Sequence, residues 1–360
     1  MVRMVILLSC LVGQTVEPAE SNDVSPTHTN RQKFSNWLEL HFWTDEGVWG
    51  GWRIQRHGSL PIHRLWNEQQ GERFRGTYEA CLVELKKQVP GEPLRRIERP
   101  VVVLLHGLVR SRDAMGQLAR YLTEKSEFHV INVAYASTHG QVEEHANSLA
   151  RVVDNLGPVN ELNFVTHSMG ALVLRRYLHA ASGSTRARPH RVVMLAPPNQ
   201  GSQLARRFRD NPWMRTVWGT SAVEIADWEP LAKQLATPDE FGIIAGGRGA
   251  MLGGNPLVDG TDDGVVSIDE TRLVGARDFL LLPVSHGSIL DSPHVHQSVL
   301  RFLKNGFFIS EEGRRPVLPP DPKPASASPA QTRSSLPSAG EPDTGLQRQD
   351  QESPLAVKPE

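Results

Sequence analysis

The sequence predicts an α/β fold in which a mostly parallel central sheet is flanked by helices. Continuous apolar runs rich in Val, Ile and Leu recur from about residue 100 to 307, and such runs are typical of strands buried on both faces. Amphipathic runs with helical spacing alternate with them, which is the pattern of parallel strands joined by helices. The chain has 360 residues, of which 39% are hydrophobic, enough for a core of that size.

Each predicted strand is a short apolar run that stops at a turn-forming or polar residue. The run PVVVLLHG at 100–107 is the clearest, because it is apolar nearly throughout and ends in glycine. The segment 111–125 is predicted to be a helix with Ser111 as its N-cap. The predicted strands are 100–107, 128–135, 162–167, 190–198, 240–247 and 278–284, and the remaining predicted helices are 141–156, 170–182 and 293–306.

Ahead of this alternation lies a region that predicts a β-hairpin. Residues 36–55 indicate two strands around a turn at 44–47 (Thr-Asp-Glu-Gly), and residues 75–88 indicate a helix. Five of the eight tryptophans fall between Trp37 and Trp66. Aromatic side chains at that density either pack against the main sheet or form a lipid-binding face, and packing is the expected use.

The two ends of the chain differ in composition from the domain expected between them, 31–312. Residues 1–30 hold a short apolar run, Met4–Val12, after a single arginine, and then a polar linker. That run fits either an export signal, including one of the lipoprotein type, or the frayed start of a cytoplasmic protein. Residues 313–360 hold ten of the 26 prolines, so a disordered tail is expected there.

Charge and cysteine content exclude several classes of function. A formal net charge of −1 gives no overall basic field for nucleic acid. Cys10 and Cys81 are too few for a disulfide framework or a four-cysteine zinc site. Because no metal-ligand spacing is visible, neither a metal nor an organic cofactor is expected. Only the N-terminal run is apolar enough to suggest a weak association with a membrane.

The stretch NFVTHSMGAL places a serine where a predicted strand meets a predicted helix. In a parallel sheet, the turns after the C-terminal ends of the strands form the crevice in which ligands bind. Ser168 lies on such a turn, and the small residues Gly170 and Ala171 follow it, as a sharp turn requires. The helix that begins there aims backbone N–H groups at the same place. The pattern predicts a nucleophile, although short serine motifs also arise by chance.

Residues 166–170 (Thr-His-Ser-Met-Gly) resemble the G-x-S-x-G motif of the α/β-hydrolase fold, and within it the lipase and esterase branch. The resemblance covers about residues 100–307, and Thr166 stands where the family has its first glycine. It implies a serine nucleophile, a histidine base and an acid that orients the base, in the chain order serine, acid, histidine. Segments rich in aspartate and histidine follow the last two predicted strands, at the edge of the sheet that carries Ser168.

Three aspartates compete for the acid, Asp259, Asp262 and Asp263. The run DDGVVS resembles the family's D-G-[LV]-V loop, which selects Asp263 and leaves the other two as turn-forming residues. His286 follows the strand at 278–284 and resembles the family's histidine loop, so it is the predicted base.

Three other histidines near these loops are set aside. His167 adjoins Ser168, but neighbouring side chains on this turn are expected to point apart. His294 and His296 fall in the closing predicted helix, where we expect them to face solvent or to lie at the helix start.

The run LLHGLVRS resembles the family's oxyanion loop, in which Gly107 permits a backbone shape that turns N–H groups inward. By that resemblance the oxyanion donors are the backbone amides of Leu108 and Met169. His106, Gly107 and Asn199 are candidates to border the substrate, with a hydrogen bond within the loop as the expected role of His106. The region 206–237, with Trp213, Trp218 and Trp228, is either a helical cap over the crevice or part of the core.

The resemblance therefore implies a serine hydrolase that cleaves carboxylic esters of small-molecule or lipid-like substrates through an acyl-enzyme, with Ser168, Asp263 and His286 as the triad. The same triad would also serve an acyltransferase or a thioesterase. A catalytically silent scaffold used for binding is the third alternative, and Thr166 is the feature that supports it.

Overall fold

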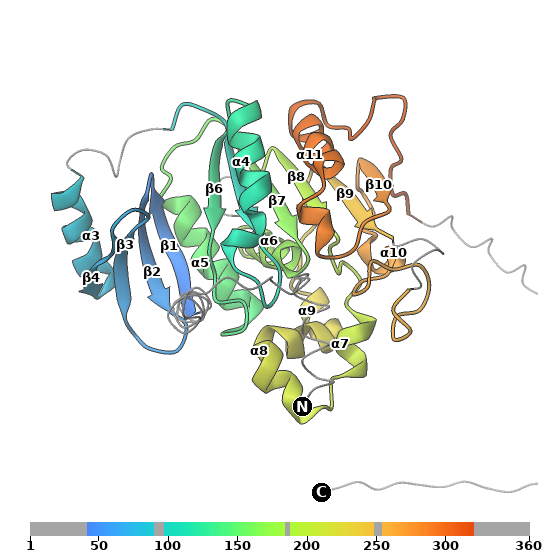
Figure 1. Cartoon of the computed structure of the whole chain (residues 1–360), viewed down its shortest axis with the longest axis horizontal. Coiled ribbons are helices and arrows are strands. Elements are labelled where there is room, and N and C mark those ends of the chain that lie inside the picture. Colours follow the sequence, from blue (N-terminus) through green and yellow to red (C-terminus); the bar gives the residue numbers. More distant parts are fainter. Residues whose placement is uncertain (1–41, 90–96, 184–187, 248–253, 320–360) are drawn as a thin grey trace, which may run out of the picture. The chain divides into compact units, whose positions relative to one another are not determined.

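A computed structural model describes residues 42–89, 97–183, 188–247 and 254–319 (Figure 1). The signal-like segment 1–30 and the chain from residue 320 onward lie outside these residues, so the expectations about them stay expectations. Within the described segments, no helix combines the length and the apolar character that crossing a bilayer needs.

The main sheet confirms the predicted α/β class and the predicted strands. Its six strands are all parallel in the order β10-β9-β8-β7-β5-β6. Every predicted strand of this sheet is present within a few residues of its expected ends. The bounds are β5 (Val101–Leu105), β6 (His129–Val133), β7 (Leu162–His167), β8 (Arg191–Leu195), β9 (Phe241–Gly246) and β10 (Asp278–Leu282).

Helices cover both faces of this sheet, and each face has its own core (Figure 1). Strand β5 shows the division, because Val101, Val103 and Leu105 pack in one core and Val102 and Leu104 pack in the other. This is the alternation expected of a strand buried on both sides. On one side lie α5 (Val142–Asp154) and α6 (Met169–Ala180), and on the other α4 (Gly116–Lys125) and α11 (Pro293–Asn305).

The N-terminal region forms a second, antiparallel sheet of four strands in sequence order. It comprises β1 (Trp43–Trp49), β2 (Trp52–His57), β3 (His63–Asn67) and β4 (Gly71–Gly76), and α3 (Tyr78–Gln88) packs against it. The predicted hairpin is therefore half of a larger sheet, and the predicted helix at 75–88 is confirmed.

The predicted turn at 44–47 is wrong, because these polar residues lie inside β1 and are buried. The turn lies at Gly50 and Gly51, between the paired residues Trp49 and Trp52, and Gly50 has a φ of +57° that favours glycine. Asp45 is stabilised in the strand because its carboxylate pairs with Arg53, accepts from Gln55 at 2.8 Å and accepts from the backbone N–H of Ala134 at 2.8 Å.

A second buried acid, Glu46, joins this sheet to α5. Its carboxylate contacts Arg56, His63 and Arg151, each at 3.0 Å, and Arg151 belongs to α5. Burial alone would raise the pKa of Glu46, but the hydrogen bond with His63 and the charges of Arg151 and Arg56 outweigh it and hold that pKa below its ordinary value.

Between β8 and β9 the chain forms three short helices, which are α7 (Gln203–Arg207), α8 (Pro212–Ala226) and α9 (Trp228–Ala232). Helix α8 is interrupted at Gly219, whose φ is +83°. A Cβ at this position would lie 2.0 Å from the carbonyl oxygen of Thr138, so only glycine allows the chain to pass there. Residues 313–319, expected to be tail, lie against the main sheet's flank, where Val317 N–H donates to Ala276 O at 3.0 Å.

Candidate active site

Ser168 lies on a sharp turn between β7 and α6, as predicted. Its φ of 52° and ψ of −125° fall in a region that L-residues rarely adopt. Such strain costs about 1–3 kcal/mol and is typical of functional positions. The turn closes tightly, because a Cβ at Gly170 would lie 2.7 Å from Leu105 O and 2.8 Å from His106 O. Glycine is therefore required at position 170, where α6 contacts the end of β5.

Thr166, which replaces the first glycine of the motif, does not prevent this turn. It is the fifth residue of β7, pairs with Leu105 and Met194 on the neighbouring strands and is fully buried. Its hydroxyl has no hydrogen-bond partner among the described residues. The side chain is accommodated within the sheet and not at the turn itself.

His286 and Asp263 meet at the same edge of the sheet. The imidazole Nδ1 lies 2.7 Å from Asp263 Oδ2, and the backbone N–H of His286 donates to Asp263 O at 2.9 Å. The other carboxylate oxygen of Asp263 accepts from the backbone N–H groups of Val265 and Val266, at 2.9 and 2.8 Å. Because a carboxylate only accepts, Nδ1 carries the proton and Nε2 is left with its lone pair.

A glycine at the end of β9 makes room for this pair. A Cβ at Gly246 would lie 2.6 Å from Val284 O and 2.8 Å from the Asp263 Cβ. The two competing aspartates do other things. Asp262 accepts from the backbone N–H groups of Asn255 and Gly264 and so shapes the loop, and Asp259 is exposed, 3.9 Å from Arg207. Of the three, Asp263 is the one that contacts His286.

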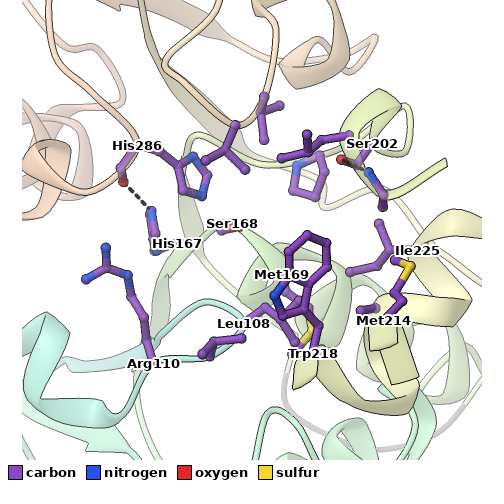
Figure 2. A pocket seen from close by; sticks show the side chains of 17 residues that line it. Leu108, Arg110, His167, Ser168, Met169, Ser202, Met214, Trp218, Ile225 and His286 are labelled. Atoms are coloured by element: carbon purple, nitrogen blue, oxygen red, sulfur yellow. Dashed lines mark hydrogen bonds between the residues drawn. The ribbon is translucent and has the colours of Figure 1, made fainter. Parts of the chain in front are cut away.

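Ser168 and His286 line one cavity of about 230 Å³ (Figure 2). His286 and His167 lie on one side of Ser168, and Met214, Trp218 and Ile225 of α8 lie on the other. Most of the lining is apolar. The lining residues are Leu108, Val109, Arg110, His167, Ser168, Met169, Pro198, Ser202, Leu204, Ala205, Met214, Trp218, Ala222, Ile225, Val265, Val266 and His286.

The region 206–237 supplies one wall of this cavity. Met214 and Trp218 precede the interruption of α8 at Gly219, Ala222 and Ile225 follow it, and all four line the cavity. Trp228, by contrast, packs against the turn at Gly201, where a Cβ would lie 2.9 Å from its ring. Both sequence interpretations thus hold in part, since one tryptophan faces the cavity and another packs in the fold. The side chain of Trp213 lies outside the described part.

The loop at 106–110 packs directly against the turn that carries Ser168. A Cβ at Gly107 would lie 2.9 Å from His167 Nδ1 and 3.0 Å from Ser168 Cβ, so the backbone approaches the serine as closely as it can. Leu108 and Met169 both line the cavity. This is where the resemblance puts the oxyanion donors.

None of the three residues expected to border the substrate, His106, Gly107 and Asn199, is among those that line the cavity. His106 is fully buried, its Nδ1 lies 2.9 Å from Gly107 O, and its ring stacks on Tyr135 at 4.1 Å. Asn199 is also buried, and its amide donates to Thr271 O at 2.9 Å and accepts from Arg175 at 3.1 Å. Both side chains are held by the protein itself, and Pro198 reaches the cavity in place of Asn199.

His167 makes a contact in the site that the sequence did not predict. Its Nε2 lies 2.9 Å from the carbonyl oxygen of His286, and the two rings are 4.7 Å apart (Figure 2). Because a carbonyl only accepts, Nε2 carries the proton. Burial, followed by the neighbouring His286 and Arg110, lowers the pKa of His167 well below its ordinary value. His167 is therefore neutral, and it lies on the cavity beside Ser168 and does not point away.

The histidines of α11 differ from each other. His294 is exposed at the start of the helix, as expected. His296 is buried and its Nε2 lies 2.6 Å from Leu290 O, so the expectation that it faces solvent is wrong. In the described segments, no three His, Cys, Asp or Glu side chains converge as a metal site requires.

The main sheet is parallel, and a strained serine lies where one of its strands meets a helix. An Asp–His pair lies at the same edge of the sheet. The chain has an α/β fold, with the parallel sheet and the strand–serine–helix turn that the resemblance to α/β-hydrolases implied. Residues 77–237 match a family model described as a domain of unknown function, DUF7379. No curated protein is significantly similar to the chain.

Several solved structures of lipases and esterases are similar to this chain. Mature lipase BlEst2 of Bacillus licheniformis is 19% identical, with a TM-score of 0.40 over 60% of this chain and 96% of that one. Est1E of Butyrivibrio proteoclasticus, with ferulic acid bound, is 11% identical, with a TM-score of 0.41 over 58% and 90%. A lipase-esterase related protein of Clostridium acetobutylicum is 12% identical, with a TM-score of 0.37 over 59% and 97%. At such values the likeness carries no conclusion about activity.

Proposed function

We propose that this protein is a serine hydrolase that cleaves carboxylic esters, with Ser168 as nucleophile, His286 as base and Asp263 as the acid that orients it. The observation that carries the proposal is the 2.7 Å contact between Asp263 Oδ2 and His286 Nδ1, at the wall of the cavity that Ser168 also lines. A serine hydroxyl needs a base to attack at neutral pH, and the contact leaves His286 Nε2 unprotonated for that task.

The reaction would proceed in two steps, acylation of Ser168 and hydrolysis of the acyl-enzyme. His286 Nε2 takes the proton of Ser168 as Oγ bonds to the ester carbonyl carbon, and returns it to the alcohol oxygen as the carbon–oxygen bond breaks. Water then attacks the acyl-enzyme while His286 accepts its proton, and the proton passes to Ser168 as the acid is released. Asp263 stays ionised and stabilises the imidazolium in both steps.

The carbonyl oxygen would accept from the backbone N–H groups of Leu108 and Met169. Met169 is the first residue of α6, where N–H groups point out of the helix. Removing one donor of this kind typically lowers kcat by about 100-fold to 1000-fold. The apolar side chains of α8 that line the cavity would contact the acyl chain of a substrate, which makes lipid-like esters the expected class.

Labelling with a fluorophosphonate probe, followed by turnover of p-nitrophenyl esters, tests this function. Ser168→Ala should lose both labelling and turnover and keep the melting temperature of the unmodified protein to within a few degrees. Ser182→Ala is the matched control, because Ser182 lies just beyond the far end of α6, where its hydroxyl donates to Leu178 O. Near-normal turnover in Ser168→Ala, or no labelling of the folded protein, would refute the assignment.

A further inference from the structure

Two consecutive carbonyl groups of the loop at 106–110 accept hydrogen bonds from buried aromatic side chains. The carbonyl oxygen of His106 accepts from the hydroxyl of Tyr135, and the carbonyl oxygen of Gly107 lies 2.9 Å from Nδ1 of the His106 ring. Because a carbonyl only accepts, Nδ1 carries the proton. Most backbone groups in a protein interior pair with other backbone groups. Here two side chains instead fix the orientation of two successive peptide units.

The second of these hydrogen bonds determines where the backbone N–H of Leu108 points. The Gly107 carbonyl and the Leu108 N–H belong to one peptide unit, and in a planar trans peptide the two groups point in opposite directions. The carbonyl is turned toward the His106 ring, which is fully buried. The N–H is therefore turned away from that ring. Leu108 lines the cavity, and a Cβ at Gly107 would lie 3.0 Å from Ser168 Cβ, so this peptide unit lies beside the nucleophile.

Tyr135 holds the His106 ring in the position that this arrangement needs. The two rings are stacked, with their centroids 4.1 Å apart and their planes 12° from parallel. The backbone N–H of Tyr135 donates to His106 Nε2 at 3.4 Å, so Nε2 accepts and the proton stays on Nδ1, the atom that faces Gly107 O. Together with its hydroxyl, Tyr135 thus fixes the position of the ring, its tautomer and the carbonyl group of the same residue.

Tyr135 is itself held firmly, two residues beyond the end of β6. It is buried, and the ring of His145 from α5 lies 5.0 Å from its own. Burial raises the pKa of Tyr135, so the hydroxyl keeps the proton that it donates. Burial also lowers the pKa of His145 to about 3, which leaves that ring neutral. Neither nitrogen of His145 has a hydrogen-bond partner among the described residues, so this ring supports Tyr135 by packing.

We propose that Tyr135 is a positioning residue for the proposed ester hydrolysis. By fixing the His106 ring and the peptide unit between Gly107 and Leu108, it points the N–H of Leu108 at the oxyanion that forms beside Ser168. This inference rests on the proposed function. Neither Tyr135 nor His106 is among the residues that line the cavity, so both act through the backbone. Their effect falls on the transition state, in which the carbonyl oxygen becomes charged, and not on the binding of the uncharged ester.

Tyr135→Phe tests the hydroxyl, because it keeps the ring stack and removes the donor to His106 O. It should lower kcat for p-nitrophenyl octanoate about tenfold, the scale of one hydrogen bond, with KM changed by less than about threefold. Tyr78→Phe is the matched control. The hydroxyl of Tyr78, in α3, accepts from Asn155 at 2.8 Å, and Tyr78 is not part of the cavity lining. This variant should leave kcat unchanged even where the melting temperature falls.

Replacing His106 tests the hydrogen bond to Gly107 O directly. His106→Leu removes the donor and should lower kcat about 100-fold, as expected when an oxyanion donor is misaligned. His106→Asn, whose amide N–H can donate to the same carbonyl, should recover most of the rate. A purely structural role of the ring would not produce this recovery.

An alkyl trifluoromethyl ketone separates the oxyanion from the rest of the site. The Ser168 hydroxyl adds to its carbonyl carbon and gives its proton to His286, which leaves a hemiketal oxyanion where the transition state has one. The inhibition constant of this ketone should therefore rise in parallel with the loss of kcat in Tyr135→Phe and His106→Leu, while KM for the ester stays nearly constant. A role in stability alone would lower the melting temperature without this parallel.

The outcomes distinguish this inference from the proposed function. If the unmodified protein cleaves no ester, the proposed function fails and the inference fails with it. If it cleaves esters and Tyr135→Phe keeps kcat within about threefold, only the inference fails. Equal losses of kcat in His106→Asn and His106→Leu would also overturn it, because the shared hydrogen bond would then not matter. If His106→Leu does not fold, the comparison of Tyr135→Phe with Tyr78→Phe decides.

Discussion

Among the described residues, the buried carboxylates Asp263 and Glu46 each contact a histidine, and the histidine of Asp263 lines the cavity that Ser168 lines. Asp263 lies 2.7 Å from His286, and Glu46 in β1 lies 3.0 Å from His63 in β3. Glu46 is also bound by Arg56 and Arg151, whose charges are permanent. Within the part of the chain that the structure describes, Asp263 accepts from backbone N–H groups and contacts its histidine, with no arginine or lysine beside it. The contact with histidine is thus not sufficient for chemistry.

The difference lies in what else satisfies the acid and where the histidine faces. Two arginines neutralise Glu46 whatever the state of His63, so that pair joins the antiparallel sheet to α5. Asp263 depends on His286 for its neutralisation, so charge that develops on the imidazole is stabilised there. His286 lines the cavity with Ser168, whereas His63 lies edge-on to the ring of Tyr78 at 5.7 Å.

The largest expected difference between the two pairs appears when each histidine is replaced. His286→Ala should lower kcat/KM for a p-nitrophenyl ester by about 10⁶-fold, the scale on which losing the base disables a serine triad. His63→Ala should change it by less than about threefold and should lower the melting temperature instead, because a buried carboxylate loses a partner. Equal kinetic losses in both variants would show that the two pairs are not functionally different.

Replacing the acids sharpens the same contrast. Asp263→Asn should lower kcat by about 10⁴-fold, because an amide N–H facing Nδ1 favours the tautomer whose Nε2 is protonated. Circular dichroism and thermal unfolding should show that the fold is kept. A loss of less than tenfold would mean that Asp263 does not hold the tautomer of His286.

A smaller effect is expected at His167. Its hydrogen bond to the carbonyl oxygen of His286 fixes the loop of the catalytic pair, and the pair of Glu46 and His63 is not contacted in this way. His167→Phe should lower kcat about tenfold with little change in KM, since the carbonyl of His286 loses its donor. His167→Asn, whose amide N–H can donate to the same carbonyl, should recover most of the rate. If the two variants lose equally, the packing of the ring and not the hydrogen bond is what matters.

The sequence anticipated the main sheet and its helices because strands buried on both faces are apolar throughout, as at 101–105. It also brought positions 168, 263 and 286 to one edge, since the C-terminal ends of parallel strands share an edge. It failed at 44–47, where a polar, turn-like run is a buried strand. No local sequence pattern indicates that Asp45 will pair with Arg53, which lies on the next strand.

The errors within the site have a related cause. His106 and Asn199 are polar residues on the predicted loops, and the sequence cannot distinguish a side chain that faces a cavity from one bound inside the fold. The sequence predicts that the side chains of His167 and Ser168 point apart, yet the strained turn at Ser168 leaves both of them on one cavity. The signal was present in its position next to the nucleophile. Arg110, which also lines the cavity, gave no such signal in the sequence, because its position depends on the unusual backbone conformation of Val109.

The smallest expected effect concerns Glu46, and it is read in stability and not in turnover. Because the folded protein lowers the pKa of Glu46 below its ordinary value of 4.5, the unfolded chain binds more protons just below that pH. The contribution of Glu46 is therefore complete above about pH 4.5 and is lost as pH falls through the lower, folded-state pKa.

Urea unfolding at pH 7, 5 and 3 measures this contribution. Glu46→Gln should reduce the free energy of unfolding at pH 7 and 5, and the difference from the unmodified protein should shrink at pH 3. Glu229→Gln, at an exposed site on α9, is the matched control and should show no such convergence. A constant difference at all three pH values would mean that Glu46 stabilises the sheet through shape and not through charge, and the contrast with Asp263 would then rest on the cavity alone.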